Sequence, residues 1–413
     1  MVPSAPPSGV KPVASTRPNV SDWTKYLSGG RTVISIGRRL RSTVVPILAA
    51  FALLTACATR PETGFLSPVT DAASGATDHT LLVATTRERD ERPGTLYNGE
   101  RGQPLGYAVT TVSIPQMHAA GEIEWPSTPP GNPKTDFVVR QARYLEGERD
   151  FVRTLNAQLA KHPRGSRKVF LFIHGYNTMF AEGLYRFAQV VHDSQTAAVP
   201  VLFTWASRGK LGAYVYDTNS ATAARDDLEH TVRLLFASDA DQVNILAHSM
   251  GNWVTVEALR QIKISGRLPA IAKLGSVFLA DADIDTDVFK SQMRRFGKPA
   301  KPFYLIVSRD DQALRLSDRI AGGTGRLGSD QNVEELAALG ATVIDLSDVK
   351  ATDPSNHSKF AQIANVAPQL TAVLARGVGA RPQERQMDGS ALGPAITTPV
   401  TLLDSSIRII AGQ

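Results

Sequence analysis

The residues best suited to chemistry lie in the pentad Ala247-His248-Ser249-Met250-Gly251. An apolar stretch, Val243 to Leu246, precedes the pentad, and a helical pattern follows it at once. This layout is typical of a nucleophile elbow, where a serine hydroxyl is exposed on a tight turn between a strand and a helix. Small residues at Ala247 and Gly251 would let strand and helix approach closely, and N–H groups at the helix start would stabilise developing negative charge. The pentad therefore predicts Ser249 as a nucleophile in acyl transfer.

A serine nucleophile needs a general base, and His357 is the candidate. Triads built on such an elbow follow the chain order serine, acid, histidine, and His357 is the histidine that lies downstream of the pentad. The segment from Asp353 to Ser358 is a loop by composition, and a helical-looking run from Lys359 to Leu374 follows it. His357 could instead be an ordinary residue at the start of that helix. The chain order favours the base.

The acid of the triad has several candidates. The expected strand Phe303–Val307 leads directly to Asp310 and Asp311, and an acid after the penultimate strand is the usual hydrolase arrangement. The preceding expected strand, 276–280, leads to Asp283 in the same way. We predict Asp311 as the group that orients His357, with Asp310 and Asp283 as alternatives. Any of these aspartates could instead cap a helix.

A second loop carries the motif His174-Gly175-Tyr176-Asn177 after the apolar run Val169–Ile173. This motif resembles the oxyanion loop of α/β-hydrolases, in which two backbone N–H groups bind the tetrahedral oxyanion. The resemblance implies the N–H of Tyr176 or Asn177 as one donor and that of Met250 as the other. The side chain of His174 is interpreted as structural.

The elements expected around these loops alternate between strand and helix, which indicates a mostly parallel sheet covered by helices on both faces. The expected α/β class rests on strands at 169–173, 199–205, 243–246, 276–280, 303–307 and 342–346, and on helices at 148–161, 180–194 and 221–236. Further β-like runs cover 80–86, 107–114 and 137–145, with a polar loop at 87–103. Residues 401–410 could add an edge strand.

A narrower resemblance joins several motifs. The resemblance to a family rests on the pentad and the His-Gly-Tyr-Asn loop together with three further motifs: Thr86-Arg87, Thr204-Trp205-Ala206-Ser207 and Asp311-Gln312-Ala313-Leu314. This set is similar to a bacterial branch of the α/β-hydrolases, filed as a domain of unknown function or as esterase/lipase-like. The resemblance covers roughly residues 80 to 375 and implies an α/β-hydrolase domain at 79–376. Trp205, Tyr214 and Tyr216 are expected either to wall the substrate pocket or to pack in the interior.

The single cysteine, Cys57, follows an arginine-rich segment and the short apolar run Thr43–Leu53. Leu54-Thr55-Ala56-Cys57 resembles the lipobox of bacterial lipoproteins, which implies a cleaved signal peptide and a lipid anchor on Cys57. Ala58 then favours the periplasmic face of the outer membrane. We expect a disordered extension and signal peptide at 1–56, a tether at 57–78 and a flexible tail at 377–413, with translation beginning near Val33.

Composition and residue spacing limit the partners and cofactors that the sequence predicts. The formal net charge of +6 is spread along the chain without a basic cluster, so no nucleic-acid partner is expected. Histidines are dispersed and cysteine pairs are absent from the sequence, so no metal or cofactor is expected. The sequence therefore predicts a membrane-anchored serine hydrolase acting on an acyl ester. An acyltransferase or thioesterase with the same triad, or a non-catalytic envelope protein on this scaffold, remains an alternative, and the oligomeric state stays open.

Overall fold

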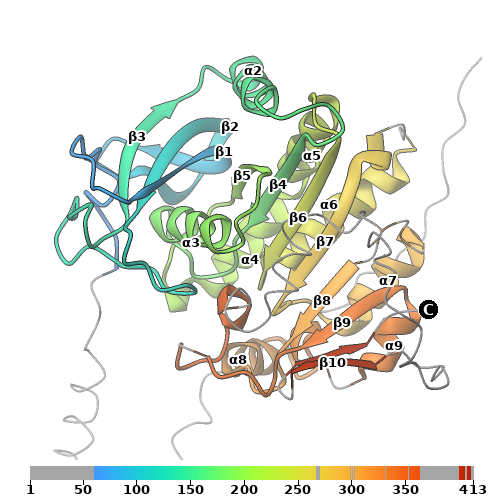
Figure 1. The fold of residues 1–413 in the computed structure, drawn as a ribbon. Coiled ribbons are helices and arrows are strands. Elements are labelled where there is room, and N and C mark those ends of the chain that lie inside the picture. The colour runs from blue at the N-terminus through green and yellow to red at the C-terminus, as the bar shows by residue number, and fades with distance from the viewer. Residues whose placement is uncertain are drawn as a thin grey trace, which may run out of the picture. The chain divides into compact units, whose positions relative to one another are not determined.

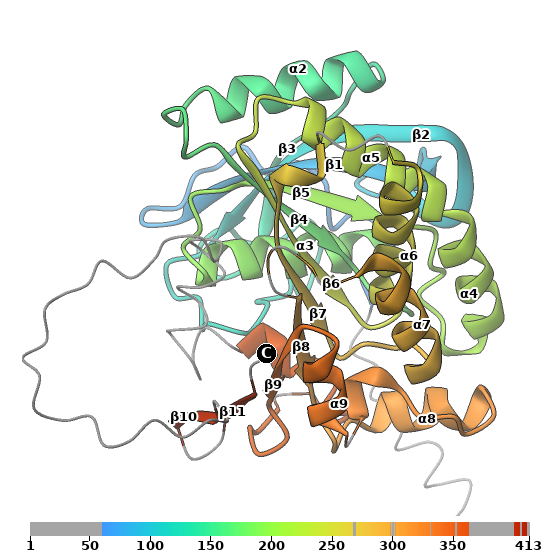
Figure 2. The ribbon, with the colours of Figure 1, turned by 90° about the vertical axis from the view of Figure 1, so that its right-hand side faces the viewer.

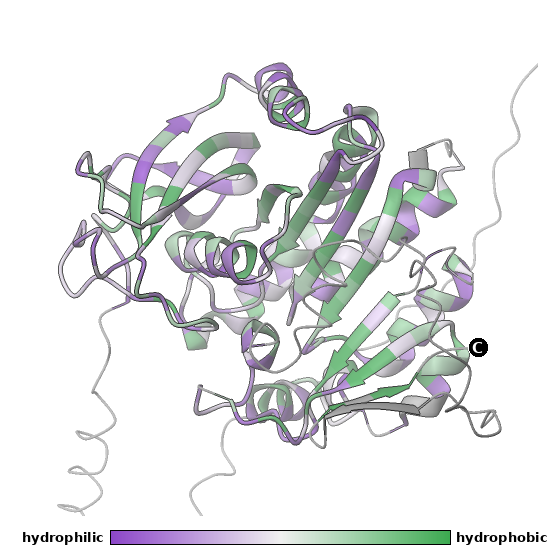
Figure 3. Cartoon of the chain, viewed as in Figure 1, coloured by the Kyte–Doolittle hydropathy of each residue, from purple (hydrophilic) through white to green (hydrophobic). Residues whose placement is uncertain are grey.

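Continuous apolar runs form the strands at the centre of the sheet. These are β4 (Lys168–Ile173), β5 (Val199–Thr204), β6 (Gln242–His248), β7 (Leu274–Ala280), β8 (Phe303–Val307) and β9 (Ala341–Asp345). Each pairs in parallel with its neighbours in this group. Their side chains are buried on both faces, which explains why hydrophobic colour dominates β4, β7 and β8 (Figure 3).

The computed structural model describes residues 60–266, 270–297, 299, 301, 303–330, 332–351, 353–362, 400–404 and 407–410. Residues Pro61–Gln413 form one unit by their contacts, and the description below concerns this unit. Cys57, the signal segment and the helical run expected after Gln362 lie outside the described residues. Among the helices that are described, none has the length and apolar character needed to cross a membrane.

The sheet order is β10-β11-β9-β8-β7-β6-β4-β5-β1-β2-β3. β1 (Thr77–Asp90) continues the parallel set beside β5, while β2 (Leu96–Ile114) and β3 (Val138–Tyr144) add an antiparallel edge. At the other edge, β10 (Val400–Asp404) and β11 (Ile407–Ile410) form a hairpin, and β11 pairs with β9. The sheet thus includes the edge strand expected near residue 401, within a segment for which the sequence predicts a flexible tail.

Helices cover both faces of the sheet, as Figures 1 and 2 show. One face carries α3 (Phe180–Asp193), packed with the short 3₁₀ turn η4 (Lys359–Gln362). The other carries α2 (Glu148–Leu159), α5 (Arg225–Ala237), α6 (Gly251–Ile264) and α7 (Thr286–Phe296). The remaining helical elements are α4 (Tyr214–Ala223), α8 (Gln312–Ile320), α9 (Val333–Ala338), η1 (Leu211–Ala213), η2 (Ala270–Lys273) and η3 (Leu327–Ser329). The predicted α/β-hydrolase architecture of the sheet and its helices is confirmed.

Two expected boundaries differ in the structure. The polar loop expected at 87–103 is largely strand, because β1 and β2 stay paired past Thr85, with Arg87 opposite Arg101 and Arg89 opposite Tyr97. The single helix expected at 221–236 is two helices, α4 and α5, which meet at Ala224. Neither boundary is visible in the hydrophobic pattern, since the hairpin is polar and the sequence carries no proline or glycine where α4 ends and α5 begins.

The segment before β1 packs on the domain. Phe65 and Leu66 are buried, and the Phe65 carbonyl accepts a hydrogen bond from the Tyr185 hydroxyl at 2.8 Å. The Val69 N–H donates to the Val139 carbonyl, also at 2.8 Å. This packing differs from the flexible tether that the sequence predicts for residues 57–78, at least from Phe65 onward.

Candidate active site

Ser249 lies at the junction of β6 and α6, where the sequence predicts a tight turn. Its φ of +53° is in the left-handed region, which is uncommon for a residue other than glycine. The Ser249 N–H donates to the Ala280 carbonyl at 3.0 Å, and its own carbonyl accepts from the Asn252 side chain at 2.9 Å. These bonds, from the neighbouring strand end and the first turn of α6, hold the strained backbone of the turn in place.

Two glycines let the neighbouring segments close on this turn. A Cβ added at Gly251 would lie 2.9 Å from the Ile173 carbonyl oxygen, and one added at Gly175 would lie 2.6 Å from the Ser249 Cβ. Such distances are too short for carbon, so both positions require glycine. The loop after β4 therefore lies directly against the serine, as an oxyanion loop must.

The two predicted oxyanion donors come from this loop and from the start of α6. Met250 is the N-cap residue of α6 and is buried, so its N–H belongs to the positive end of the helix. In the loop, the N–H of Asn177 donates to Oδ2 of Asp217 at 3.2 Å, which commits that group to a structural bond. Of the two alternatives in the loop, this bond favours Tyr176, whose role stays a prediction.

Below the loop, the buried guanidinium of Arg87 connects three segments. It donates to the Thr204 hydroxyl at 2.7 Å, to the Ser207 carbonyl at 2.8 Å and to the Thr178 carbonyl at 2.7 Å. Burial lowers its pKa to about 10, partly offset by nearby acidic groups. The sequence motif contains Arg87, yet nothing in the spacing shows that it anchors the oxyanion loop.

The His174 side chain is structural, as predicted. Its Nδ1 lies 2.8 Å from the Gly175 carbonyl, and its Nε2 lies 3.3 Å from Arg87 Nη2 and accepts from the Trp205 N–H at 3.2 Å. Burial first, and then the charge of Arg87, lowers the pKa of His174 to about 3, so the ring is neutral. Nδ1 therefore carries the proton, and the ring fixes the path of the loop.

Asp311 meets the imidazole of His357. Its Oδ2 lies 2.6 Å from His357 Nδ1, while its Oδ1 accepts the N–H of Leu314 at 2.9 Å and so caps α8. The carboxylate is fully buried. Asp311 therefore fits both expectations at once: one carboxylate oxygen lies beside His357, and the other caps the helix. The geometry supports the choice of Asp311 as the group beside His357.

The two alternative acids have other partners. Asp310 accepts from Lys359 Nζ at 2.7 and 2.8 Å and from Asn356 Nδ2 at 3.0 Å. Asp283 accepts from the Ser317 hydroxyl at 2.6 Å and pairs with Arg326 at 3.3 Å. Neither contacts the His357 ring, so the structure separates them from the role predicted for Asp311.

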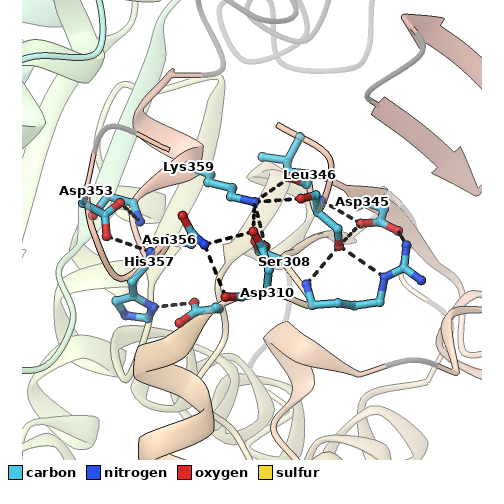
Figure 4. Close-up of polar contacts among 12 residues, drawn as sticks. Ser308, Asp310, Asp345, Leu346, Asp353, Asn356, His357 and Lys359 are labelled. Atoms are coloured by element: carbon cyan, nitrogen blue, oxygen red, sulfur yellow. Dashed lines mark hydrogen bonds and ion pairs between the residues drawn. The ribbon is translucent and has the colours of Figure 1, made fainter. Parts of the chain in front are cut away.

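The loop that carries His357 is tied at several points, as Figure 4 shows. Asp353 accepts the N–H groups of His357 and Ser358 at 2.9 and 3.0 Å. Lys359, which is fully buried, joins Asp310 to the carbonyls of Leu346 and Ser347. The two adjacent aspartates thus have different roles: Asp310 holds the loop through Lys359, and Asp311 holds the imidazole ring of His357.

His248, the residue before Ser249, contacts the same loop. Its Nε2 lies 2.9 Å from the His357 carbonyl, and the two rings are 4.8 Å apart between centroids. Burial, together with the charge of His357, holds the pKa of His248 well below its ordinary value. The neutral ring therefore donates from Nε2, and it links the elbow to the backbone of His357.

Electrostatics at His357 favour the charged ring. Burial lowers its pKa, but the hydrogen bond and charge of Asp311, followed by the charges of Asp281 and Asp283, outweigh burial and raise the pKa to about 9. The Ser249 hydroxyl and this imidazole, both among the described residues, are not hydrogen-bonded to each other here. Such contacts are often long in enzymes without substrate and shorten when substrate binds.

The three aromatic residues expected near the pocket have different surroundings. Trp205 is fully buried and stacks on His174 at 5.0 Å, so it packs in the interior. Tyr216 lies under the Arg208 guanidinium at 3.6 Å. Tyr214 meets the Tyr176 ring at 5.2 Å, and its hydroxyl lies 2.9 Å from that of Ser317. Trp205 and Tyr214 therefore both contact the expected oxyanion loop, Trp205 at His174 and Tyr214 at Tyr176.

Two cavities flank the oxyanion loop. One of about 990 Å³ lies between the β1–β2 hairpin and the start of α3, with Arg87, Phe180 and Arg208 in its wall. A smaller one of about 220 Å³ reaches His248 and Ser358 from the α3 side. Neither Ser249 nor His357 lines either cavity, so cavity volume does not identify the reacting groups here.

Comparisons with known proteins point to one family. The family model described as an alpha/beta hydrolase of unknown function (DUF900) matches residues 148–375, more than half of the 413 residues. No curated protein matches the chain.

Two solved structures of the Pyrococcus furiosus esterase Pf2001, in different crystal forms, show a distant likeness. One has 13% identity and a TM-score of 0.26, covering 52% of this chain and 85% of the esterase. The other has 16% identity and a TM-score of 0.22, covering 42% and 79%. Superpositions this weak carry no argument about function.

Proposed function

The chain belongs to the family of α/β-hydrolases of unknown function (DUF900), and we propose that it is a serine hydrolase that cleaves an acyl ester. Ser249 is the nucleophile, His357 the general base and Asp311 the group that orients it. The observation that carries the proposal is the 2.6 Å contact between His357 Nδ1 and Asp311 Oδ2, in a loop hydrogen-bonded to the residue before Ser249. Family membership does not determine the reaction, which rests on this arrangement.

The first step forms an acyl-enzyme. The Ser249 oxygen bonds to the ester carbonyl carbon as its proton passes to His357 Nε2, and the carbonyl electron pair moves onto oxygen. The N–H groups of Tyr176 and Met250 stabilise that oxyanion, and the Asp311 carboxylate stabilises the imidazolium. When the tetrahedral intermediate collapses, the imidazolium gives its proton to the departing alcohol.

The second step releases the acid. A water molecule gives a proton to His357 as its oxygen attacks the acyl carbonyl carbon. When the second tetrahedral intermediate collapses, the bond between that carbon and the Ser249 oxygen breaks, and the imidazolium returns the proton to the Ser249 oxygen. The burial of Asp311 favours this cycle, because a charge in a low-dielectric surrounding acts more strongly on the adjacent ring.

Trapping the acyl-enzyme tests the mechanism. The purified protein is mixed with a p-nitrophenyl acyl ester, quenched with acid and examined by intact-mass spectrometry. We expect a mass increase of one acyl group, mapped to Ser249 and absent from Ser249→Ala. Hydrolysis without an intermediate on Ser249 would contradict the mechanism. Adding alcohol or thiol acceptors shows whether the acyl group passes to water or to an acceptor, which separates hydrolase from acyltransferase.

We further propose that the protein is lipid-anchored at the bacterial cell envelope through Cys57. The support is the lipobox-like sequence before the only cysteine, and a membrane position makes lipid-like esters reasonable substrates. Detergent phase partition of the expressed protein, with Cys57→Ser beside it, tests the anchor. We expect the wild type in the detergent phase and the variant in the aqueous phase. Equal partition of both would exclude lipidation at this cysteine.

A further inference from the structure

Building on the proposed hydrolase, we propose that Asp281 is a positioning residue of the active site. It is a second buried carboxyl group, which acts with Asp311 on the imidazole of His357 and sets the pH above which His357 can serve as a base.

Backbone bonds place Asp281 between the two strand ends that carry the site. It follows β7, whose last residue, Ala280, accepts the Ser249 N–H at 3.0 Å. The Asp281 N–H donates to the Ile306 carbonyl of β8 at 3.0 Å, and β8 lies on the opposite side of β7 from β6, the strand that leads to Ser249. Two residues on, the Asp283 N–H donates to the Ser249 carbonyl at 3.2 Å. Asp281 thus lies between the nucleophile turn and the strand that leads to Asp311.

The Asp281 side chain differs from its neighbours in having no partner. Its residue is fully buried, and neither carboxyl oxygen has a hydrogen-bond donor among the described residues. Asp283 is paired with Ser317 and Arg326, and Asp285 caps α7 by accepting two backbone N–H groups. The backbone of Asp281 is also strained, with φ at +46°. An unpaired buried carboxyl at a strained position is unfavourable for folding and calls for another explanation.

The charges around Asp281 are those of the proposed triad. Burial first, and then the charge of Asp311, raises the pKa of Asp281 well above its ordinary value, and Asp353 acts in the same direction. The charges of His357 and Lys359 oppose this rise. Conversely, the charge of Asp281 raises the pKa of His357, with a smaller effect than Asp311 and a larger effect than Asp283.

Asp281 and His357 are therefore expected to titrate as a coupled pair. Each group favours the charged form of the other, so an ionised Asp281 holds the proton on the ring to higher pH. The same charge would stabilise the imidazolium that forms when Ser249 attacks. Asparagine at this position keeps the shape of the side chain and removes the charge, so His357 would lose its proton at lower pH.

The pH dependence of fluorophosphonate labelling tests this role. Second-order labelling rates of Ser249 are measured from pH 5 to 10 in wild type and Asp281→Asn. The midpoint of the acid limb is expected to fall by at least about half a pH unit in the variant, whereas a purely structural defect would lower rates at every pH without moving the midpoint. Coincident midpoints would overturn the proposal.

Asp285→Asn is the matched control, because it makes the same chemical change four residues away on an exposed cap. Its midpoint should equal that of the wild type. Histidine NMR of the wild type provides a measurement that does not depend on a variant folding. The His357 signal should titrate in two coupled steps, and a single step would contradict the coupling. Failure of the hydrolase proposal is separately recognisable, since the wild type would then resist labelling at every pH.

Discussion

The Nε2–H of His248 donates to the carbonyl oxygen of His357 across 2.9 Å. The residue immediately before the proposed nucleophile therefore holds the backbone of the proposed base, although the two are 109 positions apart in the chain. The bond requires a proton on Nε2, and since burial holds the pKa of His248 well below its ordinary value, the donor is the neutral ring protonated at Nε2. One side chain thus couples the geometry of the turn to the position of the imidazole.

Removing this bond should reduce turnover more than substrate binding. In His248→Phe the ring remains to pack on His357 and Phe360, but the donor is lost. A net hydrogen bond contributes about 1 kcal/mol, so we expect kcat to fall about fivefold with KM within about twofold. Steady-state kinetics with a p-nitrophenyl ester give both constants. His230→Phe, at a partly exposed site, is the control, and an unchanged kcat in His248→Phe would count against the coupling.

The pH dependence of activity should follow His357. A general base must be neutral, and the pKa of His357 is raised to about 9, so kcat/KM should increase as pH rises through about 9. Measuring kcat/KM from pH 6 to 10.5 locates this limb. A limb near the ordinary histidine value of 6.5 would show that Asp311 does not hold the ring as described.

Stability should change in the opposite direction over the same range. A folded-state pKa raised from 6.5 to about 9 stabilises the fold fully below pH 6.5, and this contribution disappears as pH rises through about 9. His357→Gln should therefore lower Tm at pH 6 more than at pH 10. Thermal unfolding at both values measures the difference, and an equal effect at both would exclude a charged ring in the fold.

Asp311→Asn should abolish most activity without unfolding the protein. Asparagine caps a helix about as well as aspartate, so the bond to the Leu314 N–H can remain. The neutral amide no longer stabilises the imidazolium or selects its tautomer, and kcat should fall by about 10⁴. Circular dichroism confirms folding beside the kinetics. Activity close to that of the wild type would assign the acid to another carboxylate.

Asp310 and Lys359 should affect stability asymmetrically. Lys359 is fully buried, while the Asp310 side chain is 42% exposed, so losing the carboxylate leaves an unpaired cation in the interior. We therefore expect Asp310→Asn to lower the free energy of unfolding by about 2–3 kcal/mol. The loss is not larger because the carbonyls of Leu346 and Ser347 still accept hydrogen bonds from the Lys359 amine. Lys359→Met should cost less. Urea unfolding of the two variants tests this order, which the reverse ranking would refute.

Gly175→Ala should disable the site through a steric clash. The new Cβ would lie 2.6 Å from that of Ser249, which forces the loop or the turn to shift. A displacement near 1 Å costs about 100-fold in rate, so kcat should fall at least that much. Gly183→Ala in α3 is the matched control, since its nearest contact would be an ordinary 3.6 Å. Similar kinetics for the two variants would mean that the loop does not need to lie against Ser249.

The sequence predicted the parallel strands, Ser249 and His357 because the type and order of residues along the chain carry a signal for each. Val169–Ile173 and Phe303–Val307 are continuous apolar runs, as expected of strands buried on both faces. Ser249 lies in a pentad with a steric reason for each small residue, and chain order restricted the base to His357. The polar hairpin arms around Arg87 and Tyr97 have no such signal, so a loop was expected there.

Other features depend on contacts between distant segments. Asp310 and Asp311 are adjacent and follow the same expected strand, so the sequence favours Asp311 but keeps Asp310 as an alternative. In the structure, what separates them is Lys359, 49 positions from Asp310 and buried against it. The roles of Arg87 and His248 likewise come from partners in segments distant in the sequence, Thr204 for Arg87 and the His357 carbonyl for His248. A pattern of residue types along the chain does not contain these contacts.

The most direct test of the central claim is fluorophosphonate labelling of the purified protein with the modified residue identified by mass spectrometry. Wild type, Ser249→Ala and His357→Ala are compared at pH 9, where about half of His357 is expected to be neutral and available as a base. The account predicts one modified residue, Ser249, in the wild type, and loss of labelling in both variants. Undiminished labelling of His357→Ala, or none in a folded wild type, would contradict a serine activated by His357.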